Sequence, residues 1–287
     1  MEETSSSASK LFGLLVRGGL FLIFIRFGGG LFGVLLYWLF DSILVASAMS
    51  LFFAAVVASA FVVRTFERGR LEDIGMAWGR DSLRHLWIGL ALGAGAGLLV
   101  MLGPVAAGAA SVIPATEAAN AFTPGKFVFV SVILLFGAVG EELMFRGYAF
   151  QILLREYGPW WVIVPFGALF ALAHLDNPGM SWLGIANTGL WGVLLGYSFF
   201  RSGDLWLPIG LHFGWNWVLP LFGVNLSGFT MGLTGYTLRW SAGALWSGGA
   251  YGVEAGVPAT AVVFGVGILL WKLRLERQPA PLLEQSS

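Results

Sequence analysis

Three groups of polar residues interrupt long apolar stretches of this 287-residue chain. In chain order they are Glu141 and Glu142 with Arg146, Phe170 with His174, and His212 with Asn216. Ionisable groups in apolar stretches are costly to bury, so such residues are functional candidates unless they are paired. A carboxylate, two imidazoles and a carboxamide together can activate water and stabilise an oxyanion. These residue types therefore indicate hydrolytic chemistry.

The amino-acid composition indicates which class of protein carries these polar groups. Hydrophobic residues make up 57% of the chain and charged residues 11%, whereas soluble domains carry about 25% charged residues. This balance excludes soluble and disordered classes and indicates a polytopic membrane protein. A formal net charge of zero offers no footprint for nucleic acid. The absence of cysteine excludes disulfides, thiolate metal sites and cysteine-protease chemistry.

The apolar stretches are long and lack the alternation of strands, so we expect an all-α fold. About 20 residues are needed to span a bilayer, and the stretches predict a transmembrane helix bundle of about eight spans. They lie at about 11–40, 42–63, 86–108, 124–151, 159–175, 181–200, 205–222 and 256–271. With the N-terminus inside, the inner segments hold Lys10, Arg64, Arg68, Arg70, Arg80, Arg84, Arg146, Arg155, Arg201, Lys272, Arg274 and Arg277. Lys126 and Arg239 then lie outside, and Arg17 and Arg26 lie within the over-long first stretch and are assigned to neither side. We therefore expect an integral membrane protein with both termini cytoplasmic.

Three regions follow from this division. Residues 1–123 form N-terminal transmembrane helices with a cytoplasmic loop at about 64–85. Residues 124–222 form a catalytic helical core, and residues 223–287 form a covering loop and the last transmembrane helix. The segment 223–255 is rich in Gly and Trp, which favours a re-entrant or covering loop. The stripe of Gly89, Gly93 and Gly97 predicts close helix packing.

The two adjacent glutamates must point in different directions. Neighbours on a helix are about 100° apart, whereas residues four apart share a face. We therefore expect Glu142 to pair with Arg146 and Glu141 to face elsewhere as a candidate general base. The purely structural alternative is a buried ion pair with one glutamate near the helix end.

The expected positions of the candidate residues along their helices place them at similar depths in the membrane. If the helix of Glu141 runs to about Glu156 and turns at 157–159, Glu141 and His174 each lie roughly 22 Å from that turn. His212 lies roughly 12 Å beyond the turn at 201–204 on the same side. Two mechanisms then stay open: water activated by a metal such as Zn²⁺ on His174 and His212, or water activated by Glu141 and the histidines alone.

The three motifs in this order resemble the CAAX protease and bacteriocin-processing family, which includes the type II CAAX prenyl endopeptidases. The resemblance covers about residues 124–222. It implies an intramembrane endopeptidase with a chamber open to the cytoplasm, in which Glu141 activates water and Asn216 stabilises the oxyanion. His174 and His212 lie beside them, supported by Glu142, Arg146 and Phe170.

The same resemblance implies a peptide or lipidated-protein substrate and contact with membrane lipid. One rival interpretation is a non-catalytic membrane scaffold or bacteriocin-immunity protein on the same fold, which a degenerate motif would favour. Another is a proton-coupled transporter, for which we would expect internal repeats. All three motifs are intact, and no convincing repeat is present.

Overall fold

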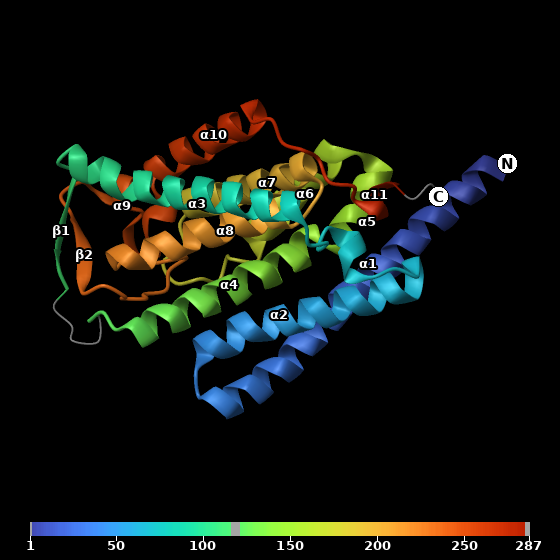
Figure 1. Cartoon of the computed structure of the whole chain (residues 1–287), viewed down its shortest axis with the longest axis horizontal. Helices are drawn as coiled ribbons and strands as arrows, with labels where there is room; N and C mark the ends of the chain where they lie inside the picture. The colour runs from blue at the N-terminus through green and yellow to red at the C-terminus, as the bar shows by residue number, and fades with distance from the viewer. Residues whose placement is uncertain (1, 116–120, 285–287) are drawn as a thin grey trace.

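Helices dominate the computed structural model of the protein, which describes residues 2–115 and 121–284. The long elements are α1 (Glu2–Phe40), α2 (Ile43–Val62), α3 (Arg80–Ala106), α4 (Pro124–Arg146), α5 (Tyr148–Tyr157), α6 (Pro159–Leu172), α7 (Trp182–Ser202), α8 (Trp206–Val218) and α10 (Val257–Lys272). The short ones are η1 (Val63–Glu67), η2 (Leu71–Ile74), η4 (Leu219–Phe222), α9 (Ala244–Ser247), η5 (Gly249–Tyr251), η6 (Val253–Ala255) and α11 (Pro281–Glu284). The long helices run side by side, and the α1–α2 hairpin extends along one flank (Figure 1).

The protein has the helices of an integral membrane protein. Five segments of the described chain are long and apolar enough to cross a membrane: Leu11–Phe40, Ile43–Glu67, Arg80–Ala106, Pro124–Tyr157 and Trp182–Ser202. The apolar helices α6 and α10 are shorter, and α8 has 13 residues. The eight-span count therefore remains a prediction.

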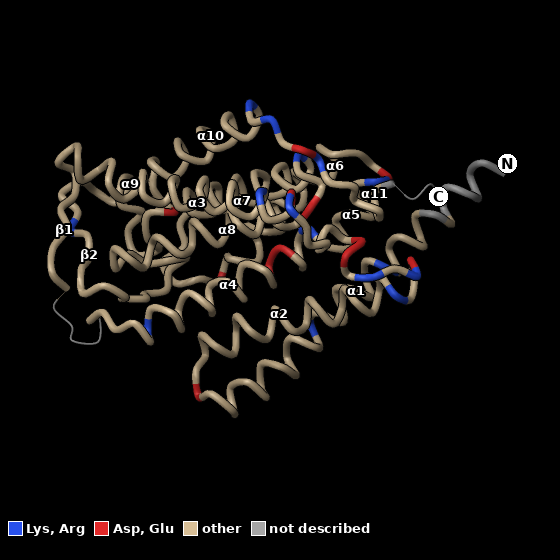
Figure 2. The backbone as a smooth tube through the Cα atoms, in the orientation of Figure 1, with Lys and Arg blue, Asp and Glu red and all other residues tan. Residues whose placement is uncertain are grey.

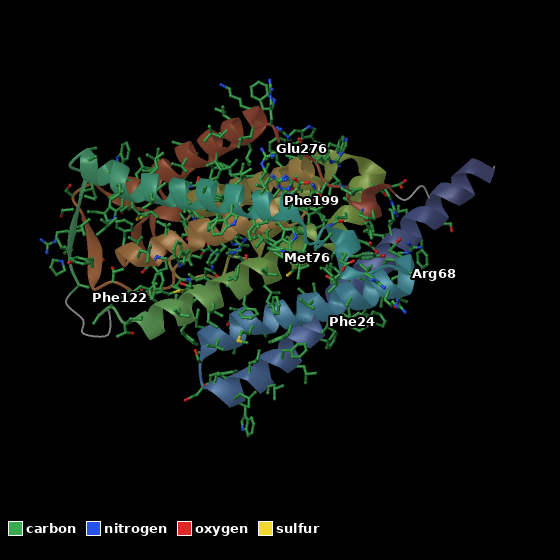
Figure 3. All side chains as sticks on the ribbon, in the orientation of Figure 1. Phe24, Arg68, Met76, Phe122, Phe199 and Glu276 are labelled. Carbon is green, nitrogen blue, oxygen red and sulfur yellow. The ribbon has the colours of Figure 1, made fainter. Side chains whose placement is uncertain are left out.

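Charge and apolar side chains are distributed as a membrane protein requires. Most Lys and Arg residues gather at the end of the bundle that carries α5 and α11 (Figure 2). Along the flank, large apolar side chains such as Phe24 project outward, whereas Phe199 lies inside the bundle with no exposed surface (Figure 3). The one-sided charge is what the positive-inside rule expects, and the location of the termini stays a prediction.

Glycines let α3 and α8 pack closely, as the stripe on α3 predicts. A Cβ atom at Gly93 would lie 2.1 Å from the carbonyl oxygen of Leu211, and one at Gly89 would lie 2.3 Å from that of Leu207. The helix α8 contributes its own glycines, since a Cβ at Gly210 would lie 2.3 Å from the Leu86 oxygen. This close packing fixes the backbone that carries His212.

The helix that carries the glutamate pair is broken at Gly147, where a continuous helix to about Glu156 was expected. The backbone of Gly147 has φ −75° and ψ −135°, outside the helical region. A Cβ atom there would lie 2.1 Å from the carbonyl oxygen of Leu143. Glycine thus lets the chain turn directly after Arg146 and start α5 in a new direction.

Residues 223–256 do not form a regular span but fold back onto the bundle, consistent with a covering loop. They contain β2 (Tyr236–Trp240), which pairs antiparallel with β1 (Ala110–Pro114) from Ala110 opposite Trp240 to Pro114 opposite Tyr236. The expected all-α bundle is confirmed, and one small two-stranded sheet is added to it. Other residues of this segment reach the cavity described next.

Candidate active site

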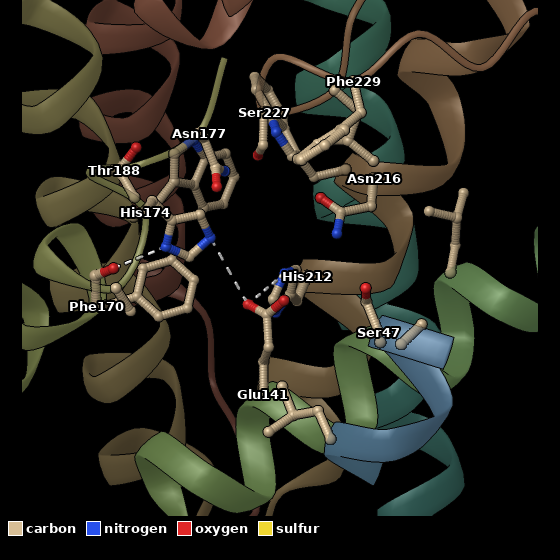
Figure 4. Close-up of a pocket in the computed structure, with 18 of the residues that line it drawn as sticks. Ser47, Glu141, Phe170, His174, Asn177, Thr188, His212, Asn216, Ser227 and Phe229 are labelled. Carbon is tan, nitrogen blue, oxygen red and sulfur yellow. Dashed lines mark hydrogen bonds and ion pairs between the residues drawn. The ribbon is translucent and has the colours of Figure 1, made fainter. Parts of the chain in front are cut away.

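A cavity of about 430 Å³ lies among the helices at the level of the three polar motifs. Its walls come from α2, α4, α7 and α8, from the end of α6 and the turn after it, and from the 223–256 segment. Figure 4 shows Glu141 rising from one side, with His174, His212 and Asn216 around it and Ser227 and Phe229 opposite. The structure therefore brings together Glu141, Phe170, His174, His212 and Asn216, all of which line this cavity.

Glu141 faces both histidines. Its Oε2 atom lies 4.0 Å from Nε2 of His174 and 3.8 Å from Nε2 of His212. These separations are too long for direct hydrogen bonds and suit a water that bridges the groups. Oε2 is buried and accepts no hydrogen bond from any described residue. The predicted division of faces is confirmed, because Glu141 lines the cavity and Glu142 does not.

Each histidine is oriented through its Nδ1 atom. His174 lies just after α6, which ends at Leu172, and its Nδ1 is 2.7 Å from the carbonyl oxygen of Phe170. A carbonyl only accepts, so Nδ1 donates and the Nε2 atom of the neutral ring keeps its lone pair. Nδ1 of His212 lies 2.8 Å from Oε1 of Glu142, which fixes the same tautomer. Both Nε2 lone pairs therefore point towards Glu141.

The predicted pair of Glu142 and Arg146 forms behind the cavity. Nη1 of Arg146 donates to Oε1 of Glu142 at 3.2 Å, and both side chains have no exposed surface. Nη2 of Arg146 also donates to the carbonyl oxygen of Gly192 at 2.7 Å, and the guanidinium lies 4.8 Å from the ring centre of Phe170. Arg146 is thus a buried support of the site, which corrects its assignment to an inner loop.

The cavity also contains polar groups that no motif indicated. Glu254, from η6, is 8% exposed, and its Oε1 accepts the indole N–H of Trp215 at 3.1 Å. Its Oε2 accepts the backbone N–H and the hydroxyl of Ser227. Asn177 and Thr188 line the same cavity. These residues lie outside the motifs, and only the tertiary fold brings Glu254 and Ser227 to α8.

The Glu141–histidine distances are wider than those between the ligands of a tetrahedral zinc ion. Zinc bonds of about 2.0–2.2 Å in a tetrahedral arrangement place neighbouring ligand atoms about 3.3–3.6 Å apart. The distances of 3.8 and 4.0 Å from Glu141 to the two Nε2 atoms are wider. Among residues 2–115 and 121–284, no group of three or more His, Cys, Asp or Glu could hold a metal ion.

The third histidine of the chain, His85 on α3, lies outside the cavity. Its Nδ1 lies 2.6 Å from Oδ2 of Asp204, and both residues are buried. Asp204 lies in the turn between α7 and α8 and also accepts the backbone N–H groups of Trp206 and Leu207 at the start of α8. The pair is therefore a buried link between α3 and the start of α8.

A comparison with protein families agrees with this geometry. Residues 123–218 match the family model described as Type II CAAX prenyl endopeptidase Rce1-like. The matched segment contains all three polar motifs and supports the resemblance to the CAAX protease family. The family implies a protease, acting on prenylated peptide substrates in membranes. No curated protein and no solved structure matches the chain.

Proposed function

We propose that the chain is an intramembrane endopeptidase of the CAAX prenyl protease type, in which Glu141 and the two histidines activate water. The observation that carries this proposal is the convergence of the Glu141 carboxylate with the two Nε2 atoms inside a helical cavity. The cavity lies largely within the Rce1-like segment. A carboxylate in such surroundings can act as a general base.

The geometry supports hydrolysis without a covalent intermediate. A water among the three groups donates one proton to Glu141, while an Nε2 lone pair orients it. Its oxygen attacks the carbonyl carbon of the scissile peptide bond, and the carbonyl oxygen becomes an oxyanion. The side-chain amide of Asn216 donates a hydrogen bond to this oxyanion. The C–N bond then breaks, and Glu141 returns its proton to the leaving amine.

Glu142 and Arg146 support this step without contacting the substrate. Because Oε1 of Glu142 accepts the Nδ1 proton of His212, it fixes which nitrogen faces the water. Arg146 balances the charge of Glu142 in a site that excludes solvent. Glu141 thus acts as the general base and Glu142 orients His212, because neighbouring residues on a helix point to different faces.

The cavity walls favour an apolar peptide or lipidated protein as substrate. Most of the lining side chains are aliphatic or aromatic, among them Leu51, Leu134, Trp191 and Leu195. A substrate that carries a lipid would present its cleavage site at membrane depth, where these side chains lie. A prenylated peptide is accordingly the first substrate class to test.

The proposal is tested by cleavage of a quenched farnesyl-peptide by the purified protein in detergent, with the same peptide lacking the lipid beside it. Mass spectrometry of the products locates the scissile bond. We expect one internal bond to be cleaved, and faster in the lipidated peptide. If neither peptide is cleaved while a resistance or transport phenotype depends on the chain, the scaffold, immunity or transporter interpretation replaces the proposal.

A further inference from the structure

One buried carboxylate at the cavity has no part in the mechanism above. Glu254 lies outside the Rce1-like segment, in the segment that folds back over the bundle. Its backbone is held by α7, because the side chain of Asn187 donates to the carbonyl oxygens of Glu254 at 2.7 Å and Gly256 at 3.0 Å. Asn187 in turn accepts the Thr260 hydroxyl at 2.7 Å. The position of Glu254 is therefore fixed independently of its side chain.

The carboxylate of Glu254 joins two parts of the site. Oε1 accepts the indole N–H of Trp215, the residue next to Asn216 on α8. Oε2 accepts both the backbone N–H and the hydroxyl of Ser227. Burial raises the pKa of the Glu254 carboxyl, and these hydrogen bonds oppose that rise. Both oxygens are thus engaged, one by the catalytic helix and one by the covering segment.

Ser227 begins a tight two-residue turn that faces Glu141 across the cavity. Residues 226–229, which we call the roof hairpin, are closed by backbone hydrogen bonds of 2.9 and 2.8 Å between Leu226 and Phe229. Ser227 and Gly228 both have positive φ, 49° and 87°, as a type I′ turn requires. Such a φ is unfavourable for serine, so the turn needs support, and Glu254 accepts both donors of this residue.

The roof hairpin presents apolar side chains to the cavity. Phe229 is 48% exposed and lies opposite Glu141 in Figure 4, whereas Leu226 is 6% exposed and also lines the cavity. A substrate bound above Glu141 would contact this surface. The hairpin, and not only the helices, therefore shapes the space beside the scissile bond.

We infer that Glu254 is a positioning residue that holds the roof hairpin over the cavity and thereby sets which substrate side chain fits beside the scissile bond. The specificity part of this inference rests on the proposed protease function. The positioning part does not, because it concerns where the hairpin lies whether or not a peptide is cleaved.

The native chain has no cysteine, so a single Leu226→Cys substitution reports on the roof hairpin. The rate of its reaction with a maleimide is measured in full-length protein that also carries Glu254→Gln. The matched control carries Glu276→Gln, which removes a carboxylate outside the cavity. A glutamine presents an N–H₂ group to Trp215 or Ser227 and loses a hydrogen bond to a charged acceptor, so we expect labelling about tenfold faster than in the control.

The second readout is kinetic, with the farnesyl-peptide and Leu226 intact. For Glu254→Gln we expect KM to rise about tenfold for a peptide with a large apolar residue beside the scissile bond, and kcat to stay within about threefold, as for a contact in binding alone. A general structural defect would instead lower the active fraction and hence kcat. Unchanged labelling overturns the positioning role of Glu254, and faster labelling with unchanged KM overturns its role in specificity.

The outcomes separate this inference from the proposed function. If wild type cleaves no peptide, the labelling comparison alone decides the positioning role. If Glu254→Gln does not fold, Ser227→Ala replaces it, because alanine at this positive φ keeps the backbone donor and the strain of a side chain but lacks the hydroxyl. Labelling about threefold faster is then expected from loss of one of three hydrogen bonds, and an unchanged rate overturns the inference.

Discussion

Two buried histidine–carboxylate pairs in this protein have nearly the same geometry and different surroundings. Nδ1 of His212 lies 2.8 Å from Glu142, and Nδ1 of His85 lies 2.6 Å from Asp204. The other ring nitrogen differs: Nε2 of His212 faces Glu141 at 3.8 Å, whereas Nε2 of His85 is buried with no hydrogen-bond partner in the described chain. The hydrogen bond at Nδ1 orients each ring. The surroundings of Nε2 then distinguish the two residues: His212 is a candidate catalytic histidine and His85 is a structural one.

The carboxylates show the same contrast. Glu142 balances a buried arginine, and Asp204 accepts the first backbone N–H groups of α8. Both carboxylates hold a histidine and a second donor, and neither lines the cavity, so neither meets a water bound there, although Oε2 of Glu142 also has no hydrogen-bond partner in the described chain. Glu141 is the carboxylate of this cavity whose Oε2 has no such partner among the described residues. Glu141 is therefore the candidate for water activation, and its neighbour Glu142 holds His212 in place.

The largest expected effect is that of Glu142→Gln on stability. It leaves Arg146, which has no exposed surface, without its counter-charge, and breaking a buried pair costs about 3–5 kcal/mol. Thermal unfolding in detergent measures the loss. The matched change Glu67→Gln removes the partner of Arg17, whose side chain is 36% exposed, and we expect a smaller loss. Equal losses for the two variants would contradict the assigned role of Glu142.

The two histidines are compared directly by His212→Asn and His85→Asn. Asparagine can keep a donor near the Nδ1 position but offers nothing at Nε2. For His212→Asn we expect kcat/KM to fall about 100-fold or more with little change in the unfolding temperature. For His85→Asn we expect kcat/KM to stay near wild type and the unfolding temperature to fall, because the smaller side chain weakens a buried link. A loss of cleavage as large in His85→Asn would break the distinction between the two pairs.

The packing that carries His212 is tested by Gly93→Ala against Gly95→Ala on the same helix. A Cβ atom at Gly93 would lie 2.1 Å from the carbonyl oxygen of Leu211, whereas nothing lies within 4 Å of one at Gly95. Overpacking should cost Gly93→Ala about 1–3 kcal/mol. Gly95→Ala should be neutral or slightly stabilising, since alanine favours helix. The unfolding temperatures of the two variants are compared, and equal values would contradict the close contact between α3 and α8.

The smallest expected effect is that of metal removal. Because Glu141 and the histidines are spaced too widely for tetrahedral zinc, we expect a chelator to leave cleavage unchanged and elemental analysis to find no stoichiometric metal. Stoichiometric zinc that is lost in His174→Ala, together with chelator-sensitive cleavage, would instead favour the metal mechanism that the sequence leaves open.

Local periodicity was enough to predict several parts of the site. The 100° step between neighbours separated Glu141 from Glu142, and the four-residue spacing indicated the pair with Arg146. Counting residues from two turns placed the histidines beside Glu141 although the helix between them is broken at Gly147. The break lies between Glu141 and the turn at 157–159, so the counted distance itself does not apply, although the residues that it was meant to bring together do line one cavity.

Contacts between distant segments could not be predicted in the same way. Glu254 meets Trp215 across 39 positions, and His85 meets Asp204 across 119. Such pairs depend on how the covering segment folds back and how closely α3 approaches α8, which no helical period encodes. The strand pairing of β1 with β2 is equally non-local. Composition indicated a covering loop at 223–255 but not that it supplies part of the cavity wall.

The most direct test of the central claim compares substrate binding and cleavage in wild type and Glu141→Gln. The substitution removes the general base and keeps the size of the side chain. We expect cleavage of the farnesyl-peptide to fall about 1,000-fold, within the range for loss of a general base, while its binding affinity, measured by fluorescence anisotropy, stays within about threefold. Cleavage above about one tenth of the wild-type rate would contradict the assignment of water activation to Glu141.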